Sequence, residues 1–368
     1  MPIEAQQKNV NVERVNSIIT AIPDSTSNSI NDITYYINKN FKSEKDKAFA
    51  AFVWIAQNIK YDVNRKIVMN DSITSQELVD STLTNRGGVC IHYATLYNEI
   101  ANKLGILSYK IEGYTKQEGK VNEEGHAWNV SRIDSVWYLI DPTWGSGGII
   151  ENKFVSRMNE KYFMASPQEM IKSHMPYDPI WQLSDYPITN EEFYGEKRTG
   201  TTYFNYKDSI KLYTNQADIE RLEKAIQRID ENGVNNDLIQ NEILGLRKQI
   251  ENYRKQEEID KYNNALADLD EGTKILNTYL DTKNKKLLTT LSDEDIKMMI
   301  NKAESKISGA SLKIKNIRSF DAAMETSIHG LENSIKTTTK KIKDEKIYLN
   351  RYFNTNKIFG KYLFDKVN

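Results

Sequence analysis

The chain has 368 residues, a formal net charge of −1, 27% charged residues and 39% hydrophobic residues. This length allows two domains, and the balanced charge excludes the strongly basic field typical of nucleic-acid-binding proteins. We find no apolar stretch near the ~20 residues that a membrane span needs. The single cysteine excludes an intrachain disulfide framework and a multi-cysteine zinc site. The first residues lack the apolar core of a signal peptide, which leaves two compartments open: the cytoplasm, or an exported mature chain.

The two halves of the chain differ in composition. All seven prolines and all five tryptophans precede residue 190. The later part carries lysine, glutamate, asparagine, isoleucine and leucine in helical spacing. We therefore expect one domain at residues 1–200 and a second at residues 201–368.

Apolar residues at helical spacing predict three helices within residues 10–60 and a short helix at residues 74–83. The chain then reaches a turn at residues 85–90. Gly87 and Gly88 permit a sharp backbone turn there. Cys90 follows and begins an apolar run that ends at Gly105, a natural helix stop.

The spacing of this run places Cys90 at a helix N-terminus. The unsatisfied N–H groups and the helix dipole favour an anion at that position, and for a cysteine the anion is the thiolate. The alternative is a small apolar residue buried on a helix.

After Gly105 the apolar pattern alternates, which predicts strands at residues 106–114, 126–130 and 135–141, with a polar loop at residues 116–124. Helices followed by a meander of strands indicate an α+β fold with an antiparallel sheet. If the last two strands form a hairpin about residues 132–134, His126 and Asp141 face each other at its open end.

A catalytic cysteine needs a base within hydrogen-bonding reach, and the chain has four histidines. His92 is only two positions from Cys90, so the two side chains diverge on a helix. His329 belongs to the helical half of the chain. For His174 we expect a structural role. His126, with Asp141 beside it, is therefore the candidate base.

Four segments carry a family resemblance: residues 88–94 around Cys90, residues 125–129 around His126, residues 137–145 around Asp141, and the tail at residues 162–183. The first three resemble the cysteine, histidine and aspartate blocks of the transglutaminase-like superfamily, whose core is similar to papain. The tail is similar to the kyphoscoliosis-peptidase-like branch. The resemblance spans about residues 45–190.

The resemblance implies a papain/transglutaminase-like core in which Cys90 is the nucleophile, His126 the general base and acid, and Asp141 the residue that fixes the imidazole tautomer. It implies no metal or other cofactor. The Cys90 backbone N–H would bind the oxyanion, with a second donor from the candidates Trp54, Tyr61 and Trp144. His92 stands where relatives often carry a small residue; it either narrows the cleft entrance or points into solvent.

From about residue 216 the pattern is heptad-like, with a break at residues 231–233 and a capping box at Ser292 and Asp295. We expect an all-α domain, a coiled coil or a bundle of three or four helices. Its apolar seam is most simply the core of an intrachain bundle. A role in binding a protein partner or in self-association is the alternative.

Two functions are compatible with these features. The first is a cysteine acyl-transfer enzyme that forms a thioester with a peptide or a glutamine side-chain amide, as a protease, an amidase or a transglutaminase. Its partner is then a protein or peptide substrate. The second is an inert transglutaminase-like fold that serves as a binding or scaffolding protein through its helical domain. Neither requires nucleic acid or a membrane span.

Overall fold

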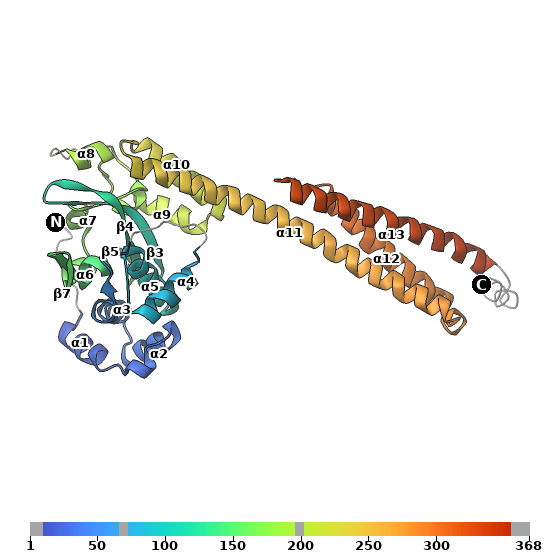
Figure 1. Ribbon diagram of the computed structural model, residues 1–368, viewed down its shortest axis with the longest axis horizontal. Helices are drawn as coiled ribbons and strands as arrows, with labels where there is room; N and C mark the ends of the chain where they lie inside the picture. The colour runs from blue at the N-terminus through green and yellow to red at the C-terminus, as the bar shows by residue number, and fades with distance from the viewer. Residues whose placement is uncertain (1–9, 66–72, 196–201, 355–368) are drawn as a thin grey trace. The chain divides into compact units, whose positions relative to one another are not determined.

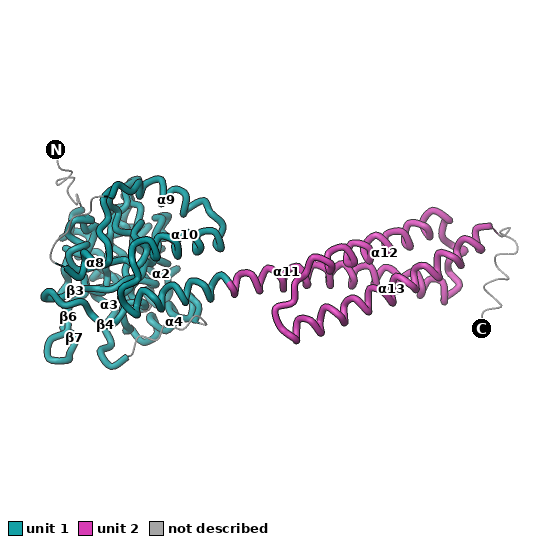
Figure 2. Tube along the Cα trace, turned by 90° about the horizontal axis from the view of Figure 1, so that it is seen from above, with its two compact units in different colours: residues 1–250 teal, residues 251–368 magenta. Residues whose placement is uncertain are grey.

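The computed structural model describes residues 10–65, 73–195 and 202–354. The chain forms two compact units, residues 1–250 and residues 251–368, which Figure 2 distinguishes by colour.

Unit 1 begins with the three predicted helices, α1 (Val12–Thr20), α2 (Ile30–Asn40) and α3 (Glu44–Asn58). A side-chain oxygen caps each one, from Asn11, Ser29 and Ser43 respectively. Residues 48–56 of α3 are all buried, so this helix lies at the centre of the main core. Figure 1 shows the three helices side by side in blue.

The predicted helix before the cysteine is α4 (Ser75–Asn85), which starts with a capping box between Thr74 and Glu77. The short strand β2 (Gly87–Gly88) follows, and then α5 (Cys90–Lys103). Cys90 is thus the first residue of a helix, as predicted.

The main sheet has four strands in the spatial order β5-β4-β3-β8, and each neighbouring pair is antiparallel. The strands are β3 (Ser108–Gln117), β4 (Lys120–Ile133), β5 (Val136–Ile140) and β8 (His174–Pro176). Asn129 Nδ2 on β4 donates to the Ala94 carbonyl oxygen at 2.9 Å, which ties the sheet to α5. The predicted α+β fold with an antiparallel sheet is confirmed.

Both hairpins of the sheet differ in detail from the prediction. The polar loop expected at residues 116–124 is strand almost throughout, because Glu118 and Gly119 turn the chain with positive φ values of 50° and 78°. Asp134 and Ser135 form the second turn in the same way.

That second turn pairs Asn129 with Ile140. The register differs by two residues from the one that would set His126 directly opposite Asp141. The pairing ends at Ile140, and Asp141 then begins the next helix, α6 (Pro142–Ser146).

The remaining short elements of unit 1 lie between the larger helices and strands. They are η1 (Asp24–Thr26), β1 (Lys60–Tyr61), β6 (Gly147–Ile150), β7 (Lys153–Ser156), η2 (Glu160–Tyr162), α7 (Pro167–Met170), η3 (Pro179–Gln182) and α8 (Asn190–Tyr194).

Three further helices complete unit 1: α9 (Tyr206–Asn215), α10 (Asp218–Glu231) and the first part of α11 (Asp237–Asn284). Ile210 of α9 packs in a cluster with Trp181, and Ile229 of α10 packs in another with Tyr114. Unit 1 therefore extends to residue 250, whereas composition placed the boundary near residue 200. These helices bury their apolar faces on the sheet and its hairpin.

Unit 2 consists of residues 251–284 of α11, η4 (Leu288–Thr290), α12 (Asp293–Ile314) and α13 (Ala322–Asn354). Ser292 caps α12 by accepting from the Asp295 N–H at 3.0 Å, so the predicted helix start is correct; the Asp295 carboxylate accepts from the Ser292 hydroxyl and does not complete a capping box. The three helices bury one shared apolar core, which confirms the helical bundle. None of the described helices combines the length and the apolar character that crossing a membrane requires.

Candidate active site

The turn before Cys90 is tied to the end of α3 by the parallel pair β1 and β2. Lys60 N donates to Arg86 O at 2.9 Å, and Asp62 N donates to Gly88 O at 3.0 Å. Tyr61 is aligned with Gly88 in this pair. The first strand after α3 therefore lies directly beside the turn that carries the cysteine.

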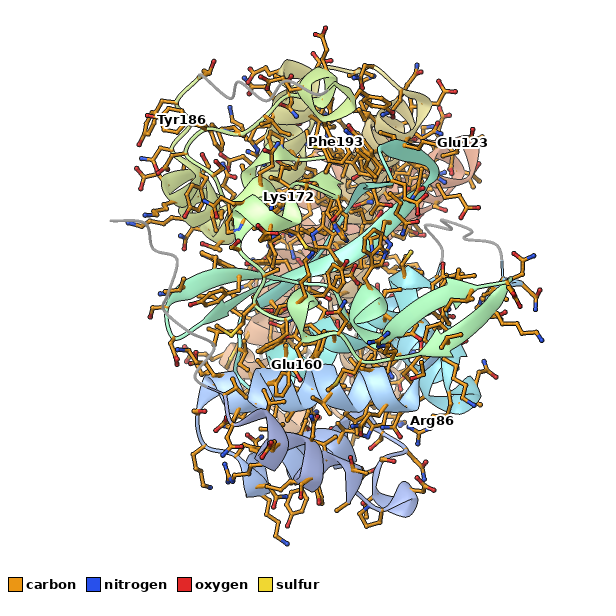
Figure 3. The ribbon with its side chains drawn as sticks, turned by 90° about the vertical axis from the view of Figure 1, so that its left-hand side faces the viewer. Arg86, Glu123, Glu160, Lys172, Tyr186 and Phe193 are labelled. Atoms are coloured by element: carbon orange, nitrogen blue, oxygen red, sulfur yellow. The ribbon has the colours of Figure 1, made fainter. Side chains whose placement is uncertain are left out.

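Arg86 anchors the same turn from the other side. Its backbone is left-handed, with φ of 49°, and its Nη2 donates to Ser27 O at 3.0 Å. The guanidinium also lies over the Trp54 ring, 5.1 Å from the ring centroid. Figure 3 labels Arg86 where it projects below the sheet, toward the helices drawn in blue.

His92 is packed against the turn. A Cβ atom on Gly88 would lie 2.5 Å from His92 Cγ, so only glycine fits there. The Val89 N–H donates to His92 Nδ1 at 3.3 Å, and the side chain is buried. Burial and the charge of Arg65 lower the pKa of His92 to about 4, so the ring is neutral. His92 caps the cysteine helix and does not point into solvent.

Cys90 packs against Ala94 of its own helix and Ala127 of β4. Its backbone N–H, at the first position of α5, has no acceptor within the helix. The residue is only 1% exposed, so the sulfur is covered in this conformation.

His126 and Asp141 form a buried pair, with His126 Nε2 2.8 Å from Asp141 Oδ2. A carboxylate only accepts, so Nε2 donates and Nδ1 is the nitrogen that remains free to interact with the Cys90 sulfur. Asp141 Oδ1 accepts from the backbone N–H groups of Thr143 at 2.8 Å and Trp144 at 3.0 Å. The carboxylate thus caps α6, which fixes its orientation.

The pair is electrostatically polarised. Burial disfavours a charged ring, but the Asp141 carboxylate and a hydrogen-bonding contact with Cys90 outweigh burial and raise the pKa of His126 to about 10. Burial likewise opposes the charge on Asp141, and the two imidazoles outweigh it and hold the pKa of Asp141 well below its usual range. The pair is therefore an imidazolium and a carboxylate at neutral pH.

His174 belongs to the same cluster, although we expected only a structural role for it. Its Nε2 lies 3.0 Å from Asp141 Oδ2, the oxygen that also accepts from His126. Strand β8 brings it there by pairing His174 with Thr115 of β3. The resemblance of residues 162–183 to one family branch is the sequence signal that could have indicated this position.

The three candidates for a second oxyanion donor lie in different places. Tyr61 is half-buried, and burial together with the charges of Cys90, Glu124 and Asp141 raises the pKa of Tyr61, so its hydroxyl stays protonated. The Trp144 ring packs on His126 and His174, with centroids 5.9 Å and 4.5 Å away. Trp54 belongs to the main core.

His126, Asp141 and His174 are also residue types that bind metals, and one donor atom from each lies within 4.8 Å of the others. Their contacts of 2.8 Å and 3.0 Å have hydrogen-bond lengths. Donor atoms around a tetrahedral zinc ion would be about 3.3 Å apart, given bonds of about 2.0–2.1 Å. The geometry therefore fits shared protons better than a shared metal.

A cysteine helix packed on an antiparallel sheet is the architecture of a papain-like fold. Residues 31–142 match the transglutaminase-like superfamily, so the chain carries a transglutaminase-like domain. The resemblance seen in the sequence is confirmed.

Kyphoscoliosis peptidase of Mus musculus is 26% identical over 190 residues, which cover 49% of this chain and 28% of the mouse protein. Cytokinesis protein 3 of Schizosaccharomyces pombe is 28% identical over 142 residues, 36% of this chain and 15% of the yeast protein. The chain thus spans less than a third of either relative. A crystal structure of a TGase aligns with 25% identity and a TM-score of 0.27, over 43% of this chain and 40% of that one.

Proposed function

We propose that the transglutaminase-like domain is a cysteine acyl-transfer enzyme acting on a peptide bond or a glutamine side-chain amide. The observation that carries the proposal is the hydrogen-bonded pair of His126 and Asp141 at 2.8 Å, with Cys90 near enough to the same imidazole to raise its pKa. Nucleophile, base and orienting group are the parts that thiol catalysis requires.

The proposed reaction has two steps. Cys90 Sγ attacks the amide carbonyl carbon, and the tetrahedral intermediate collapses to a thioester as His126 transfers a proton to the leaving amine. Water or a second amine then attacks the thioester, gives a proton to His126, and releases the Cys90 thiolate. Water produces hydrolysis, and an amine produces a cross-link.

The developing oxyanion needs donors that are already in place. The Cys90 backbone N–H is one, because it opens α5. We propose the Tyr61 hydroxyl as the second, because Tyr61 is aligned with Gly88 and is close enough to Cys90 for its charge to affect the phenol. Trp144 is the remaining candidate at the cluster.

Alkylation provides a direct test, because Cys90 is the only thiol in the chain. We expect iodoacetamide to modify the folded protein at about pH 6, where an unperturbed thiol is almost wholly protonated. His126→Ala should abolish this low-pH reaction. A thiol that reacts only after unfolding would contradict the proposal.

Turnover is tested with a peptide library, in the presence and absence of a primary amine. Release of ammonia or cleavage without amine indicates hydrolysis, and amine incorporation indicates cross-linking. Cys90→Ala is the matched control. Its melting temperature should stay near that of the wild type, because the change is small and the site is already apolar on one side.

One observation favours a second candidate, an inert domain with a binding or scaffolding role through its helices. Cys90 is 1% exposed, so a substrate carbonyl reaches the sulfur only if the residues that cover the sulfur move. Slow alkylation of the folded protein across the whole pH range, together with an inactive library screen, would support this second function.

A further inference from the structure

We propose, on the basis of the function above, that His174 is a positioning residue: it donates a hydrogen bond from Nε2 to Asp141 Oδ2 and so holds the carboxylate in line for His126. His174 touches neither the sulfur nor a substrate in this proposal. It acts through Asp141.

The carboxylate of Asp141 is fully occupied by donors. Oδ1 accepts two backbone N–H groups, and Oδ2 accepts from His126 at 2.8 Å and from His174 at 3.0 Å. An ionised carboxylate has about four acceptor positions, so each is used. Asp141 is 0% exposed, so water cannot replace a lost donor. Removing the His174 donor therefore leaves one acceptor position of Oδ2 unsatisfied, and the carboxylate gains freedom to rotate.

Ser173 selects the tautomer of His174. Its Oγ lies 2.8 Å from His174 Nδ1. His174 Nε2 carries the proton of the hydrogen bond to Asp141. In a neutral ring Nδ1 must then accept, and the serine hydroxyl donates to it. The Ser173 carbonyl in turn accepts from Lys116 N at 2.8 Å, which holds this backbone against β3.

The two imidazoles differ in charge. Burial is the largest influence on His174 and, with the repulsion of His126, lowers the pKa of His174 despite its bond to Asp141. The Trp144 and Trp128 rings flank it, with centroids at 4.5 Å and 5.2 Å. His174 is therefore suited to be the neutral donor, and the single positive charge stays on His126, the imidazole whose pKa Cys90 helps to raise.

A pair of substitutions separates positioning from packing. His174→Leu fills the site without a donor, and His174→Gln places an amide N–H near the original Nε2. We expect His174→Leu to lower kcat about 10- to 100-fold with little change in KM, and to slow alkylation of Cys90 at about pH 6. His174→Gln should recover most of both. Wild-type kcat in His174→Leu, or a folded His174→Gln as slow as His174→Leu, would overturn the proposal.

A second measurement needs neither turnover nor a stable variant. Nitrogen NMR of the wild-type protein labelled at histidine should show His174 as a neutral ring protonated at Nε2 between about pH 6 and 8. A ring protonated at Nδ1, or one that becomes a cation in this range, would refute the assignment. If Cys90 proves unreactive, the proposed function fails while these spectra still decide the role of His174.

Discussion

The interiors of the two units differ in the kind of side chain that they bury. Unit 1 buries a cluster of polar side chains around Asp141, together with His92 and Asn129. In the described part of unit 2, Thr338 is the one buried polar residue, and the core is otherwise aliphatic and aromatic. Charge in unit 2 stays near the surface, in pairs such as Lys313 and Asp268.

The two kinds of core constrain their side chains in different ways. A core of aliphatic side chains fixes volume, and it tolerates changes that preserve volume. A buried polar cluster fixes directions, because each donor must meet its acceptor. We therefore expect changes of a few atoms in unit 1 to alter chemistry with little effect on stability, and truncations in unit 2 to alter stability with no effect on chemistry.

The largest effect is expected for Asp141→Asn. The amide is nearly the same size, but it offers a donor where Nε2–H needs an acceptor, so His126 turns or takes the wrong tautomer. In a serine triad the same exchange costs about 10⁴ in rate. We expect a similar fall in kcat/KM in a peptide or amine-incorporation assay. Asp134→Asn, at an exposed hairpin turn, is the matched control and should leave the rate unchanged.

The next effect is expected for Tyr61→Phe, which removes one hydroxyl. If that hydroxyl binds the oxyanion, kcat should fall about 10²- to 10³-fold, as for other oxyanion donors, while the melting temperature stays close to that of the wild type. Tyr35→Phe, at a largely exposed position, is the control. An unchanged kcat in Tyr61→Phe would show that Tyr61 is not the second oxyanion donor, and Trp144 would be the next candidate to test.

Most of the site could be predicted because its signals are local. Two glycines before an apolar helical run place Cys90 at a helix start, and alternating strands bring His126 near Asp141. The register could not be predicted, because a turn at Asp134 and Ser135 and a turn one residue earlier fit the same pattern. His174 was missed because its contact with Asp141 depends on β8 pairing with β3, which no local pattern specifies.

The boundary between the two units lies at residue 250, and not at residue 200 as composition indicated, for a related reason. Helical periodicity shows that a helix has an apolar face, but not which surface that face covers. The stripe that contains Ile229 reads like a heptad seam, yet it packs with Tyr114 of the β3–β4 hairpin. The ion pair of half-buried Arg228 with Asp178, in contact at 2.6 Å, holds the same helix to the rest of unit 1.

In unit 2 we expect Ile300→Ala to lower the free energy of unfolding by about 2–5 kcal/mol, because it opens a cavity in the bundle core. Denaturant titration followed by circular dichroism measures the change. Leu312→Ala lies on the same helix at a 65% exposed position and should cost less than about 0.5 kcal/mol. The rate of Cys90 alkylation should be the same in both variants, and a change in that rate would show that the bundle influences the site.

The smallest effect is expected for Lys346→Ala, which removes an ion pair with Glu304. The two groups are 2.7 Å apart, but their side chains are 40% and 46% exposed, so water and salt screen the attraction. Pairs of this kind contribute about 0–1 kcal/mol. The change in unfolding free energy should shrink as ionic strength rises, and a titration at low and high salt measures it. A cost well above about 1 kcal/mol that persists at high salt would mean that the aliphatic stem of Lys346, not its charge, packs on the bundle.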